Sequence, residues 1–349
     1  MKAVGYQQNL PISHTDSLVD IDLPQPQAQG RDILVKVAAI SVNPVDTKIR
    51  ANVAADAGQH KVIGWDAVGE VVAVGPEVKL FNAGDRVWYA GDLTRPGSNA
   101  EYQLVDERIA AVAPSSLSNA EAAALPLTAI TAWELLFDRL GLTPQLSEIN
   151  NDSAAELGAP KPVILIVGAA GGVGSILTQL AAKLTDATVV ATASRPETAD
   201  WVKELGADIV INHHQPMLEQ LQQAGLSSVT HVASLTHTDD HLDQLIEALA
   251  PQGKLALIDD PQQDIDIKKL KRKSLSLHWE FMYTRSMFST WDMQKQHELL
   301  TRVAELIDGD VLQTTLGEHY GRINAENLKK AHALLESNKA MGKLVLEGF

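Results

Sequence analysis

The fold of this chain is decided by one stretch, Val163-Ile-Leu-Ile-Val-Gly168-Ala-Ala-Gly171-Gly172-Val-Gly174-Ser175. Its five consecutive apolar residues predict a strand that is buried on both faces. Apolar residues then recur at helical spacing between Ile176 and Leu184. A strand, a glycine turn and a helix in this order suit pyrophosphate binding, because a helix N-terminus offers free N–H groups and the positive end of its dipole.

The glycine turn has the pattern A-x-G-x-x-G, because Ala169 stands where a dinucleotide-binding turn usually has its first glycine. We expect Gly171 to let the backbone approach the phosphates and Gly174 to let the helix pack close to the strand. The residues of the turn that we predict to contact the cofactor are Ala169, Ala170, Gly171, Gly172, Val173 and Gly174.

Strands and helices are predicted to alternate from residue 163 onward. The predicted strands cover 163–167, 188–192, 208–211, 231–233 and 254–258, with a possible sixth at 274–281, and helices fall near 175–185, 196–205, 215–224 and 238–250. This alternation predicts an α/β fold with a doubly wound parallel sheet.

The flanking parts of the chain have a different pattern of predicted secondary structure. Residues 1–126 are β-rich, with strands expected at 33–40, 67–75, 82–89 and 101–105. Helices are expected at 120–124, 128–140 and 293–307, and a last strand at 342–346. The polar segment 145–161 is predicted to be a surface loop.

Composition excludes several classes of function. The chain has 349 residues and a formal net charge of −15, which argues against binding to nucleic acid or anionic membranes. We expect no signal peptide at the polar N-terminus and no apolar stretch near the ~18 residues that span a bilayer. Cysteine is absent, which excludes disulfides, thiol catalysis and thiolate zinc sites. A cytoplasmic location is the simplest interpretation.

The end of the second predicted strand bears on the choice of cofactor. An acidic residue there would bind the ribose of NAD, but the strand runs into Ser194-Arg195-Pro196 with no carboxylate. Ser194 can donate a hydrogen bond to a 2′-phosphate, and Arg195 can engage it with its planar fork. Alternatively, Ser194 caps the helix after Pro196 and Arg195 is solvated. The two interpretations are compatible, and we predict NADPH as the cofactor.

Several blocks of sequence together identify a family. They are Ser41-Val-Asn43-Pro-Val-Asp46-Thr-Lys-Ile-Arg50, Gly64-Trp-Asp-Ala-Val-Gly69, Gly84-Asp-Arg-Val, Leu125-Pro-Leu-Thr-Ala-Ile-Thr-Ala-Trp133, the glycine turn, Leu205-Gly-Ala-Asp and Gly342-Lys-Leu-Val-Leu. With these blocks, nearly the whole chain resembles the medium-chain dehydrogenase/reductase superfamily. The nearest branch is quinone oxidoreductase-like, often labelled zinc-type alcohol dehydrogenase-like.

The resemblance implies an architecture. Residues 1–126 and 286–349 should form a GroES-like catalytic domain, and residues 127–285 a Rossmann dinucleotide-binding domain. The active site should lie in the cleft between the two, and a homodimer is expected.

The resemblance also implies where zinc would bind in metal-dependent members. The position of the first cysteine ligand corresponds to Asn43. The histidine–glutamate pair corresponds to Trp65-Asp66, and the second cysteine to a position near Leu127. These residues lack the thiolate and imidazole donors that zinc prefers, so we predict no zinc.

The resemblance places Asn43 and Thr128 beside the nicotinamide ring, although Asn43 also suits a turn before Pro44 and Thr128 suits a helix cap. Asp46 is a candidate for orienting the loop or relaying a proton, and Asp66 is a candidate proton donor.

Further cofactor contacts are predicted outside the turn. His213 is a candidate near the adenosine, with a plain surface turn as the alternative. Leu235 and Ile258 sit at the carboxyl ends of predicted strands, where cofactor contacts concentrate. Phe281 joins them from the stretch His278-Trp-Glu-Phe-Met-Tyr.

These expectations favour a zinc-independent, NADPH-dependent reductase of an electrophilic small molecule such as a quinone, an enone or another reactive carbonyl compound. Two alternatives stay open. One is an alcohol dehydrogenase that holds zinc through other ligands. The other is an NADPH-binding protein without enzyme activity.

Overall fold

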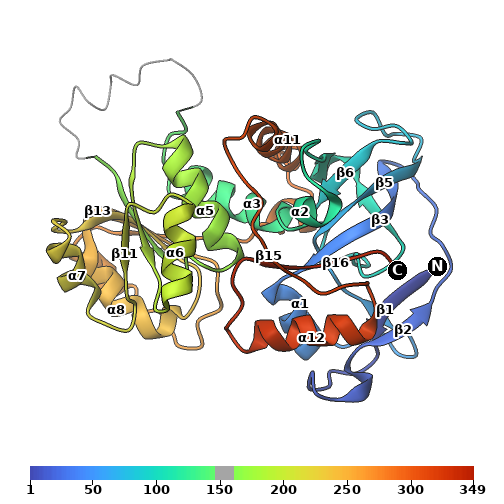
Figure 1. Cartoon of the computed structure of the whole chain (residues 1–349), viewed down its shortest axis with the longest axis horizontal. Helices are drawn as coiled ribbons and strands as arrows, with labels where there is room; N and C mark the ends of the chain where they lie inside the picture. The colour runs from blue at the N-terminus through green and yellow to red at the C-terminus, as the bar shows by residue number, and fades with distance from the viewer. Residues whose placement is uncertain (146–160) are drawn as a thin grey trace. The chain divides into compact units, whose positions relative to one another are not determined.

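The structure is a computed structural model that describes residues 1–145 and 161–349. The predicted loop 145–161 lies outside the described residues except for its two end positions. The chain divides into two compact units, one made of Met1–Ile130 and Met282–Phe349 and the other of Thr131–Phe281 (Figure 1). The family resemblance implied boundaries at 126/127 and 285/286.

The second unit is built on a parallel sheet with the strand order β11-β10-β9-β12-β13-β14. Its strands are β9 (Val163–Val167), β10 (Thr188–Thr192), β11 (Ile209–Ile211), β12 (Val229–Ser234), β13 (Leu249–Leu257) and β14 (Ser276–Trp279). Its helices include α5 (Gly172–Leu184), α6 (Pro196–Glu204), α7 (Met217–Gln223), α8 (Thr238–Ala248) and α9 (Lys268–Lys271). The predicted doubly wound parallel sheet is confirmed.

Strand β9 is central because both of its edges are paired. Ile164 lies opposite Val189 of β10 and opposite His231 of β12. Residues Ile164 to Val167 are buried, which explains why this strand is an uninterrupted apolar run rather than an alternating one.

The turn after β9 brings the start of α5 against the strand end. A Cβ added at Gly174 would lie 2.4 Å from the carbonyl oxygen of Gly168 and 2.5 Å from Cα of Ala169. Both neighbours are backbone atoms that cannot move aside. Gly174 is therefore required by close packing, as the sequence indicated.

The first unit contains two sheets. The larger has the order β15-β16-β3-β5-β6-β8, with β7 also paired to β3, and the smaller has the order β2-β1-β4. Their strands are β1 (Lys2–Tyr6), β2 (Val19–Asp22), β3 (Asp32–Val42), β4 (Lys61–Val62), β5 (Ala67–Val74), β6 (Arg86–Tyr89), β7 (Tyr102–Asp106), β8 (Ala110–Val112), β15 (Leu316–His319) and β16 (Lys343–Glu347).

Helices of the first unit are α1 (Pro44–Asn52), α2 (Asn119–Ala123), α10 (Thr284–Met287), α11 (Lys295–Asp308) and α12 (Ala325–Glu336), together with the start of α3 (Pro126–Trp133). The sequence analysis expected one helix and one strand after residue 285 and so missed α12 and β15. It also did not predict helices α1 and α10 or the short strands β1, β2, β4 and β8. The amphipathic pattern of α12 is interrupted by His332, which is buried.

The expectation of no apolar stretch long enough to span a bilayer was wrong. The helical segment Asn119–Arg139 is long and apolar enough to cross a membrane by length and composition alone. It has 21 residues and a mean hydropathy of 1.2 over its most apolar window. However, 78% of that window is buried inside the protein, which is typical of a core helix.

We expect Gly174→Ala to lower the free energy of unfolding by about 1–3 kcal/mol, because the new methyl group overlaps fixed backbone atoms. Gly171→Ala is the matched control. Gly171 has a φ of −74° and an added Cβ there would meet its nearest neighbour at an ordinary 3.4 Å. Urea denaturation of both variants measures the difference, and equal stability of the two would contradict the packing role of Gly174.

Candidate functional site

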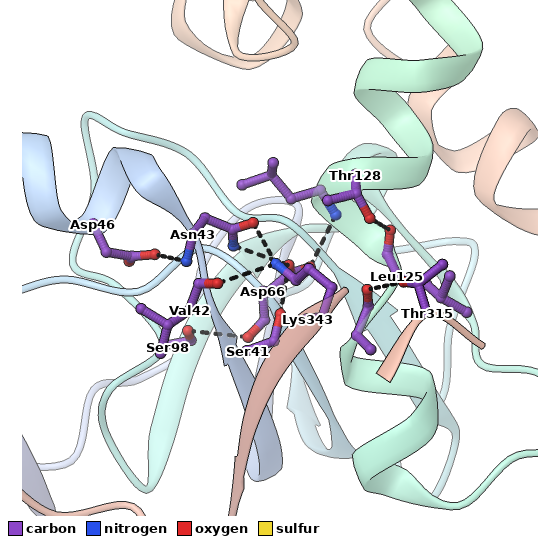
Figure 2. Close-up of polar contacts among 12 residues, drawn as sticks. Ser41, Val42, Asn43, Asp46, Asp66, Ser98, Leu125, Thr128, Thr315 and Lys343 are labelled. Carbon is purple, nitrogen blue, oxygen red and sulfur yellow. Dashed lines mark hydrogen bonds and ion pairs between the residues drawn. The ribbon is translucent and has the colours of Figure 1, made fainter. Parts of the chain in front are cut away.

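Neighbouring strands of the larger sheet bring remote residues together at one place. Leu344 of β16 pairs with Val42 of β3, and Ile40 of β3 pairs with Ala67 of β5. The residues just beyond these pairs, Lys343, Asn43 and Asp66, therefore lie close together, and Figure 2 shows their side chains converging. The resulting group is called here the Asp66 cluster and comprises Ser41, Asn43, Asp66, Leu127 and Lys343.

The carboxylate of Asp66 is the acceptor at the centre of this cluster. Its Oδ2 accepts hydrogen bonds from the Ser41 hydroxyl at 2.8 Å, the Asn43 amide at 3.0 Å and the Lys343 ammonium at 3.0 Å. Its Oδ1 accepts the Leu127 backbone N–H at 2.9 Å. All four partners act as donors, and Asp66 is fully buried. Asp66 is therefore the acceptor for all four groups, and its predicted role as a proton donor stays a prediction.

Asn43 is held at both ends of its side-chain amide. Its Nδ2 donates to Asp66, and its Oδ1 accepts from the Lys343 ammonium. Asn43 also stands at the N-cap position of α1, before Pro44, as the turn interpretation expected. Its predicted contact with the nicotinamide or a substrate stays a prediction.

Lys343 was missed as a site residue. The segment Gly342-Lys-Leu-Val-Leu was interpreted as a final strand and as a block shared with the family, with no role given to its lysine. A lysine within an apolar strand is nevertheless a signal of a buried charge that needs a partner. The structure places its side chain at 3% exposure in an ion pair with Asp66.

Asp46 lies in α1 and its carboxylate closes the start of that helix. Its Oδ2 accepts the backbone N–H of Asn43 at 2.5 Å, which satisfies one of the unpaired amides at the helix N-terminus. Its Oδ1 is buried and has no hydrogen-bond partner among the described residues. Burial raises the pKa of Asp46 to about 7, outweighing the opposing effects of the Asn43 N–H and the Lys343 charge. Capping is thus an observed role, and the proton relay stays a prediction.

The raised pKa gives Asp46 a measurable effect on stability. The native state holds a proton between pH 3.8 and about 7 that the unfolded chain releases, so the contribution of Asp46 to stability falls as the pH rises through this range and is flat above it. The slope is up to ~1.4 kcal/mol per pH unit.

We therefore expect wild-type protein to lose stability relative to Asp46→Asn as the pH rises toward 7, because the amide keeps the cap without titrating. Denaturant unfolding of both proteins across this range measures the difference. A difference that does not change with pH would contradict the burial-raised pKa.

Thr128 is buried near the start of α3. Its hydroxyl donates to the Leu125 carbonyl at 3.0 Å rather than accepting an N–H as a cap would (Figure 2). Thr315 makes a similar bond to the Ala124 carbonyl at 3.1 Å. The hydroxyl of Thr128 keeps its acceptor capacity, which is compatible with the predicted nicotinamide contact but does not test it.

The residues present do not fit a zinc ion. Within residues 1–145 and 161–349, no group of three or more histidine, cysteine or acidic side chains gathers closely enough to hold a metal. The Asp66 cluster offers one carboxylate and amide or hydroxyl groups, and it already contains an ammonium. Zinc prefers thiolate and imidazole donors, which this cluster lacks.

The glycine turn of the second unit has the backbone that a dinucleotide pyrophosphate requires. Gly171 is the N-cap of α5, and the predicted contacts from Ala169 to Gly174 make up the turn and the first helical residues. The amides of the first helical turn lack partners within the helix and point toward its N-terminal end. The turn thus fits the phosphates of a nicotinamide dinucleotide.

Leu235 and Ile258 directly follow β12 and β13, the two strands next to β9 on one side. The Leu235 N–H donates to the Val167 carbonyl at 3.2 Å, and the Ile258 N–H donates to the Ser234 carbonyl at 3.4 Å. Both residues therefore lie at the carboxyl edge of the sheet, where ligands of parallel sheets bind.

Ser194 and Arg195 follow β10 at the same edge. The alternative that Ser194 caps the next helix is wrong, because the N-cap of α6 is Arg195, whose backbone N–H donates to Thr198 Oγ1 at 3.3 Å. The Arg195 guanidinium is 41% exposed and lies 3.5 Å from Glu197. Ser194 is exposed and is not used by the helix cap.

His213 lies in the turn after β11 within a group of histidine rings. Its ring centroid is 4.3 Å from that of His214 and 5.7 Å from that of His241. Burial, and then the neighbouring histidines, lower the pKa of His213 to about 4, so it is neutral at pH 7 and can bind a ligand only by hydrogen bonding or packing. Phe281 is 47% exposed beyond the end of β14.

Comparison with known proteins supports the interpretation of both units. Residues 29–115 match the family model described as alcohol dehydrogenase GroES-like domain, and residues 205–346 match the model described as zinc-binding dehydrogenase. A zinc-type alcohol dehydrogenase-like protein of Staphylococcus aureus is 40% identical over 99% of both chains.

Solved structures give the same result. A putative zinc-dependent alcohol dehydrogenase protein from Rhizobium etli is 52% identical, with a TM-score of 0.93 over 100% of this chain and 98% of that one. A quinone oxidoreductase from Coxiella burnetii is 26% identical, with a TM-score of 0.79 over 99% of both chains. A mycobacterial protein solved with NADPH is also 26% identical, with a TM-score of 0.81 over 99% of both.

A GroES-like unit and a parallel Rossmann-type sheet in one chain define a two-domain dehydrogenase/reductase. The chain belongs to the medium-chain dehydrogenase/reductase superfamily, among its zinc-type alcohol dehydrogenase-like members, and it is an oxidoreductase by family. The resemblance seen in the sequence is confirmed.

Proposed function

We propose that the protein is a zinc-independent, NADPH-dependent oxidoreductase that transfers hydride to a quinone, an enone or another reactive carbonyl compound. One observation carries the proposal. The Asp66 cluster, at the positions that correspond to zinc ligands, presents an amide, a carboxylate and an ammonium but no thiolate or imidazole. We further propose that the protein works in the cytoplasm as a homodimer.

The absence of zinc-type donors limits the chemistry. Oxidation of an alcohol is helped by a Lewis acid that stabilises the developing alkoxide. The Asp66 cluster cannot supply such an ion with the ligands it has. Reduction of an acceptor that is already electron-poor needs less polarisation, so it suits this site better.

The cofactor would supply the hydride, and the chain would bind and orient it. The amides at the start of α5 would hold the pyrophosphate, with Gly174 keeping the helix close to the strand. Ser194 and Arg195 would bind the 2′-phosphate, with the Arg195 guanidinium exchanging its contact to Glu197 at 3.5 Å for the phosphate. No carboxylate stands directly at the end of β10 to bind the ribose hydroxyls of NAD. The neutral His213 would pack near the adenosine.

Purified protein should consume NADPH in the presence of quinones and enones. The loss of NADPH absorbance measures this consumption. The expected result is turnover with at least one electron-poor acceptor and little or no oxidation of simple alcohols with NADP. A control without acceptor measures background oxidation. Tight NADPH binding with no turnover across a broad panel would instead favour the non-enzymatic alternative.

Arg195→Ala should weaken NADPH binding about 10–100-fold and leave NADH binding nearly unchanged, because a charge-assisted bond to phosphate is lost. Lys203→Ala, which removes an exposed charge from the same helix, is the control. Fluorescence titration with both cofactors measures the ratio. An unchanged preference in Arg195→Ala would show that Arg195 does not bind the phosphate.

A zinc-dependent alcohol dehydrogenase is the second candidate, because the matched family description and the S. aureus relative both carry zinc in their names. Elemental analysis of protein purified without chelators separates the two functions. We expect no stoichiometric zinc. One zinc per chain, together with loss of activity on chelation, would favour the alcohol dehydrogenase.

A further inference from the structure

Lys343 places a fully buried positive charge inside the Asp66 cluster. Its ammonium donates to Asp66 Oδ2 at 3.0 Å, to the Val42 carbonyl at 3.3 Å and to Asn43 Oδ1 (Figure 2). An ammonium has three N–H donors, and here each has an oxygen acceptor. Burial of a charge is costly unless it is paired and hydrogen-bonded, and Lys343 meets both conditions.

The position of this ammonium is imposed by the fold. Antiparallel pairing of β16 with β3 puts Lys343 beside the end of β3, where Asn43 begins the next segment. The preceding residue, Gly342, has a φ of +60°, and a Cβ there would lie 2.6 Å from the Thr315 carbonyl oxygen. The backbone before Lys343 is therefore fixed in a conformation that side chains other than glycine rarely adopt.

The acceptors around Lys343 are a carboxylate, an amide oxygen and a backbone carbonyl. Such a set of oxygens attracts a cation. In this protein the Lys343 ammonium is that cation. The family resemblance implies that Asn43 and Asp66 also correspond to metal-site positions of zinc-dependent members. A divalent ion here would have to displace the ammonium or lie beside it, which like-charge repulsion opposes.

We propose that the Lys343 ammonium takes the place of the metal in this protein, as the fixed positive charge that neutralises Asp66 and orients the Asn43 amide. Lys343 is a positioning residue, since it acts through Asn43. The amide oxygen points to the ammonium and the amide NH₂ to Asp66, so the side chain has one orientation. The effect on turnover rests on the proposed function, whereas the fixed ammonium does not.

The fixed charge is tested by ¹H–¹⁵N spectra of lysine ammonium groups at neutral pH. An ammonium that is buried and bonded to three oxygens exchanges its protons slowly, whereas exposed ones exchange fast. We expect a protected ammonium signal in wild-type protein and in Lys36→Met, which removes an exposed lysine from β3. Lys273 also donates its ammonium to three backbone carbonyls and can give a protected signal of its own. The signal of Lys343 is therefore the one that should disappear in Lys343→Met.

Lys343→Met leaves Asp66 buried without its partner and risks failing to fold. The double variant Lys343→Met/Asp66→Asn removes both charges and is the second test protein. It should also lack the signal while remaining folded. A wild type without a protected ammonium, or Lys343 variants that keep every protected signal of the wild type, would overturn the fixed charge.

The positioning role is tested by kinetics. Where wild-type protein turns over, the folded Lys343 variants should show a kcat about 10²-fold lower, with the KM for NADPH changed little, because a misplaced amide affects the reacting geometry and not the phosphate contacts. A kcat equal to that of wild type would overturn the positioning role. If wild-type protein reduces no acceptor, the proposed function fails, and the spectra still decide the fixed charge.

Discussion

The buried carboxylate of Asp66 is the interaction on which the site of the first unit depends. It gathers donors from the end of β3, the start of α3 and the start of β16, so three separate parts of the chain meet at one side chain. Two buried opposite charges are stable together only when hydrogen bonds satisfy their remaining atoms. Ser41, Asn43 and the Leu127 amide provide those bonds.

The neighbouring carboxyl groups of Asp66 and Asp46 have different hydrogen-bond partners. Asp66 accepts from an ammonium and three other donors, whereas Asp46 accepts one backbone N–H and has an oxygen without a partner among the described residues. Burial without a direct counter-ion raises the pKa of Asp46 to about 7.

The second unit depends on backbone geometry instead. Gly174 leaves the space that lets the start of α5 pack against the end of β9, and this shapes the glycine turn. The carboxyl ends of the parallel strands form the edge of the sheet where ligands bind. Fold alone does not fix function, so the chemistry of this protein depends on side chains such as those of the Asp66 cluster.

The sequence by itself determined the parallel sheet, the glycine turn and the family, because apolar runs, glycine spacing and helical periodicity are local signals. It also named Asn43, Asp46, Asp66 and Thr128 as site candidates. Only the tertiary structure decided what these residues touch. Lys343 bonds Asp66 across 277 residues and Asn43 across 300, through a strand pairing that no local spacing encodes. The burial of these side chains could not be inferred from the sequence either. Burial raises the pKa of Asp46, and Asp66 is buried in an ion pair with Lys343. The cost of a buried charge depends on neighbours that only folding assembles.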